Sequence, residues 1–292
     1  MPISHLRAFR VRHYECDPYA TLSPAGYLRY MQEAAFDASA AAGYGVVRYQ
    51  AMGRSWLIRE TDIHYLRPLR HGDVVEVKTW VADFQRVRSR RAYEFRQAAT
   101  GELVARAVTD WAFLESATGH PAAIPPELVI AFFPEGAPRM ALPRRHLSLQ
   151  SPPPDAFRMR RQVEWADLDP GQHVNNARFL ALVEECAIQA TAALGWPPER
   201  LRAAGLRLAP RRHQIEYVQP GLFAEQLEFA SWLSGFDAES AIRCCVITRN
   251  GGATVLARAR AEWTCCELDS AQAVSMPESL RCNLLPTSQR HD

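Results

Sequence analysis

Apolar and polar positions follow a helical period over one segment in each half of the chain. In the second half, apolar side chains recur about 3.6 residues apart at Phe179, Leu180, Val183, Ala187, Ala190, Ala193 and Leu194. Asn175 precedes this segment at the position of a helix N-cap, and Gly195 follows it at the position of a C′ glycine. The spacing predicts a helix over residues 176–194. A second helix is predicted over residues 24–42, with Ser23 as its cap.

After each helix the period of the pattern changes from 3.6 to 2, which is typical of strands with one buried face. The alternation is clearest over Val75 to Val81 and over Leu227 to Leu233. Turn sequences at His71-Gly72-Asp73 and Asn250-Gly251-Gly252 separate such runs. One long helix followed by several antiparallel strands predicts an α+β fold.

The two halves of the chain match each other at a constant offset of 152 residues, without a gap over about 90 positions. The matching pairs include Asp17 with Asp169, Glu33 with Glu185, Gly43 with Gly195, Tyr65 with Tyr217, Trp80 with Trp232 and Trp111 with Trp263. The chain therefore contains two copies of one unit of about 115 residues. Because the predicted helices are rich in small residues, a curved antiparallel sheet can close around each. We expect a tandem hotdog fold, whose two copies can pair within one chain.

The same comparison predicts the domain boundaries. Residues 1–118 and 156–268 form the two units. Residues 119–155 hold nine of the twenty prolines and are predicted to be an extended linker. Residues 269–292 are polar, lack a period and are expected to be a mobile tail. A homodimer of the chain is left open.

The composition indicates an ordinary soluble globular protein, with 48% hydrophobic residues, 23% charged residues and a net charge of +2. This charge gives no reason to expect a nucleic-acid partner. We find no apolar run of the roughly 18 residues that span a membrane, and no signal-peptide core at the N-terminus. The seven cysteines include the adjacent pairs Cys244-Cys245 and Cys265-Cys266, which suit neither a metal nor an easy disulfide. We expect a reduced, cytoplasmic protein with cysteines in its core and no metal.

The chemistry-bearing residues gather in the segment Trp165 to Asn176, which holds two acids, a histidine and two asparagines. Asp169 and His173 stand just before the predicted second helix. The free backbone N–H groups at a helix N-terminus can stabilise a developing oxyanion. Taken alone, Asp169 is more typical of a capping or turn acid before a helix than of a catalytic residue. No G-x-S-x-G, glycine-rich phosphate loop or H-E-x-x-H is present.

This segment resembles the signature W-x-D-L-D-x-N-Q-H-V-N-N of the plant and bacterial acyl-ACP thioesterases. It matches that signature at every defined position except Gly171, where the family has asparagine. The first half is similar to the same family over stretches such as Gly72 to Trp80 and Ile124 to Glu127, so the resemblance covers most of residues 9–265.

The resemblance implies that catalysis resides in the second copy, without a cofactor. Asp169 would act as general base or direct nucleophile on the thioester, and His173 would orient the thioester or share the proton transfer. Backbone N–H groups at Asn176 would polarise the carbonyl, and the Asn176 side chain could hydrogen-bond within the site. The family's downstream glutamate falls near Gln219, which we expect to hold the attacking water instead.

Further residues are candidates for binding the substrate. Gly171, Val174 and Asn175 flank the catalytic pair, although Asn175 is expected to act mainly as the helix cap. Met31 and Trp56 of the first copy are candidates for an acyl pocket, with core packing as the alternative for each.

The first copy lacks the catalytic constellation. Thr21 stands in place of His173, and Ser23-Pro24 in place of the two asparagines, although Asp17 remains. We expect this copy to be non-catalytic and to shape the acyl pocket.

The expected function is hydrolysis of a fatty acyl thioester on acyl carrier protein, which would be the partner. An acyl-CoA thioesterase on the same fold, a weakly catalytic acyl-thioester-binding protein and a hotdog dehydratase are the alternatives. Arginine clusters could dock an acidic carrier or a CoA phosphate, or simply be solvated; they lie at 88/90/91, 144/145, 158/160/161 and 211/212.

Overall fold

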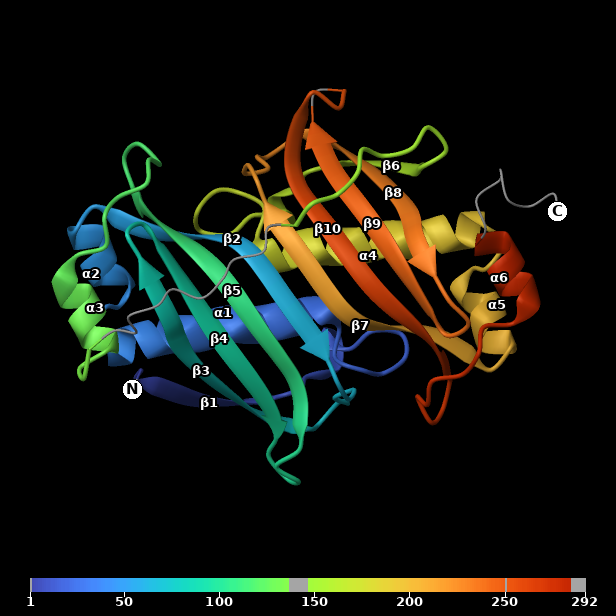
Figure 1. The fold of residues 1–292 in the computed structure, drawn as a ribbon, viewed down its shortest axis with the longest axis horizontal. Coiled ribbons are helices and arrows are strands. Elements are labelled where there is room, and N and C mark those ends of the chain that lie inside the picture. Colours follow the sequence, from blue (N-terminus) through green and yellow to red (C-terminus); the bar gives the residue numbers. More distant parts are fainter. Residues whose placement is uncertain (1, 137–146, 250, 285–292) are drawn as a thin grey trace. The chain divides into compact units, whose positions relative to one another are not determined.

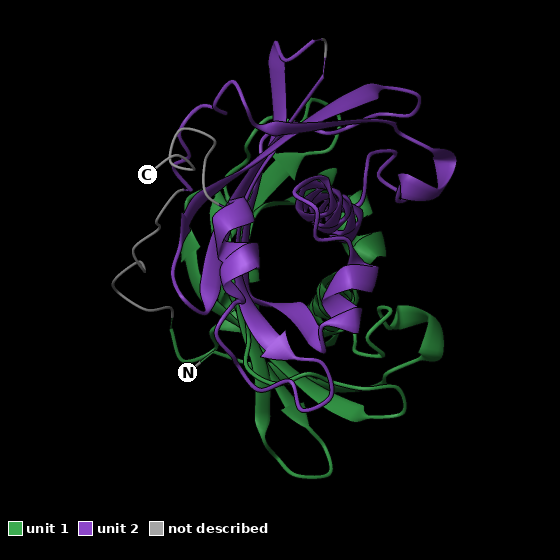
Figure 2. Cartoon of the chain, turned by 90° about the vertical axis from the view of Figure 1, so that its right-hand side faces the viewer, with its two compact units in different colours: residues 1–146 green, residues 147–292 purple. Residues whose placement is uncertain are grey.

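The order of elements in the first half of the chain recurs in the second half. The computed structural model describes residues 2–136, 147–249 and 251–284 and divides into two compact units, residues 1–146 and 147–292 (Figures 1 and 2). Most equivalent elements begin 152 positions apart, as for the long helices that start at Pro24 and Asn176. The predicted internal repeat is therefore present in the fold.

The first unit is built from an antiparallel sheet and a long helix. Its strands pair in the order β1-β3-β4-β5-β2. In chain order the elements are β1 (Ser4–Arg10), the short 3-10 helix η1 (His13–Glu15), α1 (Pro24–Ala41), α2 (Val46–Ala51), β2 (Arg54–Tyr65), β3 (Val74–Gln85), β4 (Arg88–Gln97), β5 (Leu103–Glu115) and α3 (Pro126–Phe132).

The second unit repeats this arrangement. Its strands pair antiparallel in the order β7-β10-β9-β8-β6, which is the same order with each strand replaced by its repeat. In chain order the elements are β6 (Phe157–Gln162), η2 (Trp165–Asp167), α4 (Asn176–Ala193), α5 (Pro198–Ala203), β7 (Leu206–Tyr217), β8 (Gln226–Phe236), β9 (Ser240–Arg249), β10 (Thr254–Glu267) and α6 (Glu278–Leu284).

The two long helices begin at their predicted caps and end before their predicted glycines. The Ser23 hydroxyl accepts a hydrogen bond from the Gly26 N–H at 3.3 Å, and the Asn175 side-chain oxygen accepts one from the Ala177 N–H at 2.9 Å. Gly43 and Gly195 follow the helices with φ of +81° and +84°, a left-handed conformation that glycine adopts without strain. Local sequence therefore fixes both ends of each helix.

Each sheet curves around its own helix, as expected for the hotdog fold (Figure 1). The alternation along β3 is confirmed, since Val75, Val77 and Val81 are buried. The facing side of α1 carries small side chains such as Ala34, which lets the strands approach closely. Register shifts, such as the one between Ile58 and Glu60 in β2, add twist and curvature.

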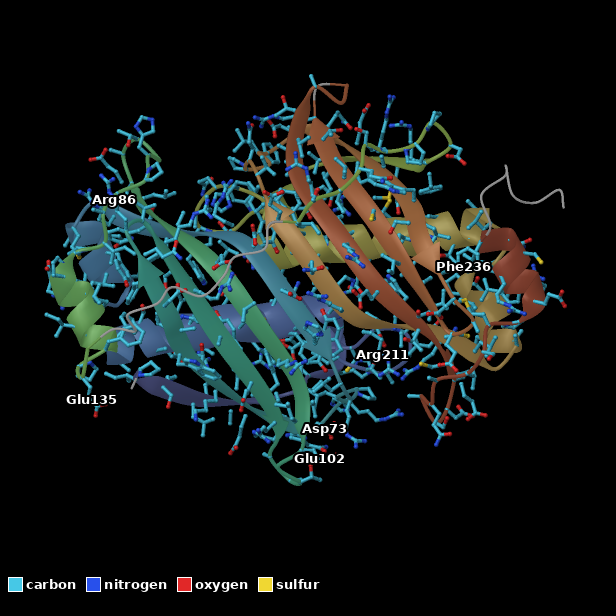
Figure 3. The ribbon with its side chains drawn as sticks, viewed as in Figure 1. Asp73, Arg86, Glu102, Glu135, Arg211 and Phe236 are labelled. Atoms are coloured by element: carbon cyan, nitrogen blue, oxygen red, sulfur yellow. The ribbon has the colours of Figure 1, made fainter. Side chains whose placement is uncertain are left out.

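The predicted linker and tail both begin too early. We placed the linker from residue 119 and a mobile tail from residue 269, but both segments contain a helix packed on the unit before it. Leu128 of α3 and Leu280 of α6 are fully buried, 152 positions apart. Phe236 of β8 packs against the cluster that contains Leu280 (Figure 3). Residues 137–146 of the linker and 285–292 of the tail lie outside the described residues.

Most of the cysteines lie in the core of the protein. All seven cysteines are free thiols, and the two adjacent pairs are buried, as predicted, whereas Cys16 is half-buried and Cys282 exposed. In the described part of the chain, no helix has both the length and the apolar character needed to cross a membrane.

A buried arginine occupies the same position in each unit. Arg243 of β9 donates to the hydroxyls of Ser231 and Thr191, at 3.4 and 3.5 Å, and Arg91 of β4 donates to Thr79 at 3.4 Å. Burial lowers the pKa of both guanidinium groups. Thr191 lies in the last turn of α4, whose carbonyls carry partial negative charge. These weak contacts do not offset the desolvation of a buried cation.

We therefore expect Arg243→Met to raise the free energy of unfolding by about 1 kcal/mol, because methionine fills a similar volume without burying a charge. Urea unfolding of the wild type and the variant measures this difference. Arg160→Met, at an exposed position, is the control and should change stability by less than about 0.5 kcal/mol. A loss of stability in Arg243→Met would show that the end of α4 stabilises the guanidinium by more than burial costs.

Candidate active site

The segment between η2 and α4 folds into a tight turn that brings Asp169 and His173 together. The Asp169 N–H donates to the His173 carbonyl at 3.0 Å, and the Gln172 N–H donates to the Asp169 carbonyl at 2.9 Å. Gln172 has φ of +61°, an uncommon conformation for a residue other than glycine. The backbone itself therefore holds the two side chains on the same turn.

The Asp169 carboxylate is partly exposed and accepts two hydrogen bonds from its own loop. The Gly171 N–H donates to Oδ1 at 2.8 Å, and the Asn175 side chain donates to Oδ2 at 3.3 Å. Because these donors leave further lone pairs on each oxygen, the carboxylate can still accept a proton or a water.

His173 lies beside this carboxylate, with Nδ1 3.6 Å from Asp169 Oδ1. This distance is too long for a hydrogen bond, but catalytic pairs commonly shorten when substrate binds. A Cβ atom added to Gly171 would lie 2.9 Å from both Asp169 Oδ1 and His173 Nε2. Glycine at this position therefore allows the two side chains to converge.

The N-terminus of α4 supplies backbone donors next to the pair. The Asn175 side-chain oxygen accepts a hydrogen bond from the Ala177 N–H, and the Asn175 backbone carbonyl accepts one from the Phe179 N–H at 3.0 Å. Within the described residues, nothing accepts from the N–H groups of Asn176 and Arg178. Two donors at the positive end of a helix therefore remain for an anionic oxygen.

A fully buried carboxylate anchors the loop to the rest of the unit. Asp167, 1% exposed, accepts from the Glu164 N–H at 2.8 Å, from Arg178 at 2.5 Å and from Arg161 at 3.2 Å. Its carbonyl accepts the Asn175 N–H at 3.0 Å. Burial alone would raise the pKa of Asp167, but the Glu164 N–H and the two guanidinium groups outweigh it and lower this pKa.

Sequence reasoning missed the role of Asp167, Arg161 and Arg178. Their separation along the chain gives no pattern, because β6, η2 and α4 meet only in the folded unit. One indication was available. Glu15 occupies the position of Asp167 in the first copy, whose loop has Thr21 in place of His173, so an acid at this position serves the structure. Glu15 is buried and accepts from the Tyr30 hydroxyl at 2.6 Å.

The equivalent loop of the first unit is closed by its own hydrogen bonds. Asp17 accepts from the N–H groups of Tyr19 and Thr21 at 2.9 and 3.0 Å, and from the Thr21 hydroxyl at 2.9 Å. Thr21 thus fills the place of the histidine and engages the second carboxylate oxygen. This arrangement is that of a turn acid, and the non-catalytic role of the first copy stays a prediction.

Three predicted residues of the second unit have other contacts in the structure. Gln219 is exposed, and its Oε1 accepts from Arg249 at 3.0 Å; its role in holding a water stays a prediction. Val174 is buried against Gly221. The Asn176 carbonyl accepts from the Tyr217 hydroxyl at 3.2 Å, which secures the first turn of α4.

The two candidates in the first unit are part of its apolar interior. Met31 is buried on α1, and Trp56 packs on Phe113 with ring centroids 4.7 Å apart. Their role in an acyl pocket stays a prediction.

Most of the arginines predicted to form clusters are engaged in specific pairs. Arg90 makes a bidentate ion pair with Asp110 at 3.0 and 2.7 Å, and Arg160 pairs with Glu228 at 2.9 Å. Arg211, labelled in Figure 3, donates to a threonine hydroxyl at 3.2 Å. Arg144 and Arg145 lie outside the described residues.

In the part of the chain that is described, no group of three or more metal-binding side chains is arranged around a common point.

Asp167→Asn should lower the free energy of unfolding by about 3 kcal/mol at pH 7, because it leaves two arginines without their buried counter-charge. Since the folded pKa of Asp167 lies below its ordinary value of 3.8, its contribution is present above that value and lost as the pH falls through the folded pKa. Urea unfolding from pH 7 to pH 3 should therefore show the two proteins converging.

Glu164→Gln is the matched control for this experiment, because Glu164 also pairs with Arg161 but is exposed. It should cost less than about 0.5 kcal/mol at any pH. An equal effect in both variants would contradict the anchoring role of Asp167.

Comparison with known proteins identifies the family of the chain. A sequence model of the thioesterase-like superfamily matches residues 11–132 and 163–284, which are the two copies. A chloroplast dodecanoyl-[acyl-carrier-protein] hydrolase of Umbellularia californica is 25% identical over 92% of this chain and 70% of that protein. A chloroplast acyl-[acyl-carrier-protein] hydrolase of Cuphea viscosissima is 30% identical over 61% of this chain and 45% of that protein. The chain spans about half the length of most of these curated relatives.

Two solved structures show the same fold. A 12:0-ACP thioesterase from Umbellularia californica has a TM-score of 0.72 and 23% identity over 89% of this chain and 93% of that chain. An acyl-ACP thioesterase from Bacteroides thetaiotaomicron has a TM-score of 0.71 and 18% identity over 89% of this chain and 97% of that chain. These likenesses confirm the predicted tandem hotdog fold.

Proposed function

The chain belongs to the thioesterase-like superfamily, and from this premise we propose that it hydrolyses fatty acyl thioesters carried on acyl carrier protein, releasing the free fatty acid. The observation that carries the proposal is the Asp169–His173 pair beside the open N-terminus of α4. The carrier is proposed from the relatives, whose names specify acyl-[acyl-carrier-protein] hydrolysis, one of them aligned over 92% of this chain.

In the proposed reaction, Asp169 accepts a proton from a water molecule, and the resulting hydroxide attacks the thioester carbonyl carbon. The carbonyl oxygen becomes an oxyanion, which the N–H groups of Asn176 and Arg178 stabilise by about 3 kcal/mol per donor. The oxyanion then collapses, the C–S bond breaks, and the thiolate leaves. A simple thiol has a pKa of about 8.5, so His173 need only orient the substrate or return the proton to the thiolate.

The two units divide the work in this proposal. The Asp17 carboxylate is held by Thr21, so the first loop offers no comparable base. We propose that the first unit contributes apolar surface to the acyl chain, with Met31 and Trp56 as candidates, and that Gly171, Val174 and Asn175 flank the thioester. The free thiols support a reducing, cytoplasmic setting.

One observation supports a second candidate, an acyl-thioester-binding protein with little turnover. Gln219, the residue expected to hold the attacking water, is exposed and engaged with Arg249. Steady-state release of fatty acid from acyl carrier protein separates the candidates, because a binder would saturate with substrate without releasing product.

Asp169→Asn should lower kcat for acyl-ACP hydrolysis by about 10³-fold, because the amide still accepts the Gly171 N–H but cannot take up a proton. Release of free fatty acid measures kcat, and a thermal melt within a few degrees of the wild type shows that the variant is folded. Unchanged turnover would exclude Asp169 as the base.

Asp17→Asn is the matched control at the equivalent position of the first unit and should reduce kcat by less than about threefold. A loss as large as that of Asp169→Asn would contradict the proposed division of work between the units.

A further inference from the structure

An exposed apolar patch, formed by Trp165, Leu222 and Phe223, lies beside the Asp169–His173 loop. Trp165 on η2 is 73% exposed, and Phe223 and Leu222, in the turn before β8, are 58% and 45% exposed. The Trp165 and Phe223 rings meet edge to face with centroids 6.2 Å apart. Large apolar side chains gathered in water are typical of a binding surface.

The first unit shows that the fold does not require apolar side chains at these positions. Trp165 and Phe223 correspond to His13 and His71, each 152 residues earlier. These histidines also meet edge to face, with centroids 5.7 Å apart and an interplanar angle of 81°, against 83° for Trp165 and Phe223. The turn therefore accommodates a pair of rings in both units, but only the unit with the Asp169–His173 pair makes them hydrophobic.

The patch shares its backbone with the candidate active site. The segment that carries Phe223 is hydrogen-bonded at one end to the residue after β6, from the Ala224 N–H to the Val163 carbonyl at 3.0 Å. At its other end it is bonded to the loop, from the Val174 N–H to the Gly221 carbonyl at 2.9 Å. The Trp165 carbonyl accepts the Leu168 N–H at 3.2 Å. The patch and the turn that carries Asp169 and His173 are thus joined through backbone hydrogen bonds of the same unit.

The charges around the patch are paired with one another. Glu164, next to Trp165, pairs with Arg161 at 3.3 Å, and Glu225, close to Phe223, pairs with Arg249 at 2.7 Å. The patch therefore presents apolar rings without an excess charge. Such a surface suits a neutral ligand with methyl and amide groups better than a phosphate or an acidic protein surface.

The two arms of an acyl thioester, the fatty chain and the pantetheine chain, differ in polarity. The fatty chain is apolar and suits a buried interior, whereas the pantetheine arm is a neutral chain with two amides and a pair of methyl groups. We propose that Trp165 and Phe223 bind the pantetheine arm while the thioester carbonyl lies at Asp169 and His173. This inference rests on the proposed thioester hydrolysis and identifies how the leaving group is held.

The test is the double variant Trp165→His/Phe223→His, which replaces both rings by the residues at the equivalent positions of the first unit. The variant is expected to fold, because the first unit already accommodates two histidines in this turn. Acyl-ACP and acyl-CoA both carry the arm, whereas the S-(2-hydroxyethyl) thioester of the same fatty acid lacks it. We expect KM for both arm-bearing substrates to rise about tenfold with kcat changed less than about twofold. For the hydroxyethyl thioester, kcat/KM should be the same in variant and wild type.

The matched control is His13→Trp/His71→Phe, which places the aromatic pair on the first unit and should leave all three substrates unaffected. An equal loss on the hydroxyethyl thioester would overturn the proposal, because the rings would then support only the loop. A loss with acyl-ACP alone would also overturn it, since the rings would then contact the carrier protein and not the arm.

A separate measurement keeps this inference distinct from the proposed reaction. If the wild type hydrolyses no acyl thioester, the proposed function fails, and the subsite is tested by calorimetry with a non-hydrolysable S-alkyl pantetheine thioether. A dissociation constant about tenfold higher in Trp165→His/Phe223→His than in the wild type supports the subsite. Equal binding by the two proteins, or no binding by the wild type, overturns it.

Discussion

The buried carboxylate of Asp167 is the contact on which the geometry of the candidate site depends. It joins the end of β6 through Arg161, the turn η2 through the Glu164 N–H, and the first turn of α4 through Arg178. Two half-buried cations around one buried acid make a strong interaction, because the carboxylate would be a desolvated charge without them. The loop between Asp167 and α4 is short, so fixing both of its ends leaves Asp169 and His173 little freedom to separate.

The duplicated fold separates what this scaffold requires from what the site adds. Both loops keep a buried acid, a cap at the start of the long helix and one residue with positive φ, Ala20 or Gln172, at the same place in the turn. The differences lie in side chains. In the first loop the Thr21 hydroxyl donates to the Asp17 carboxylate, whereas in the second loop His173 stands at that position beside Asp169. The two turns thus share backbone hydrogen bonds and differ in the side chains around the aspartate.

The sequence predicted the features that depend on local or periodic information. The caps at Ser23 and Asn175 and the alternation along β3 are written into neighbouring residues, and the repeat appears as a constant offset. The helices α3 and α6 were missed because seven residues are too few to show a period, although Leu128 and Leu280 fall on the same offset. The Asp167 contacts and the pairing of Gln219 with Arg249 join residues distant in sequence, so only the fold reveals them.

The glycine at position 171 illustrates how a departure from a family motif can be part of a working geometry. The motif places an asparagine there, and its absence suggests at first a lost function. In this loop, however, a Cβ atom at that position would meet the Asp169 carboxylate and the His173 ring at 2.9 Å each. Any side chain would have to displace one of them. The Gly171 N–H donates to Asp169 at 2.8 Å, as the Tyr19 N–H does to Asp17 at 2.9 Å in the first unit. The backbone therefore supplies a hydrogen bond to the carboxylate at the position where the motif has a side-chain amide, and the substitution is compatible with a functional acid–imidazole pair.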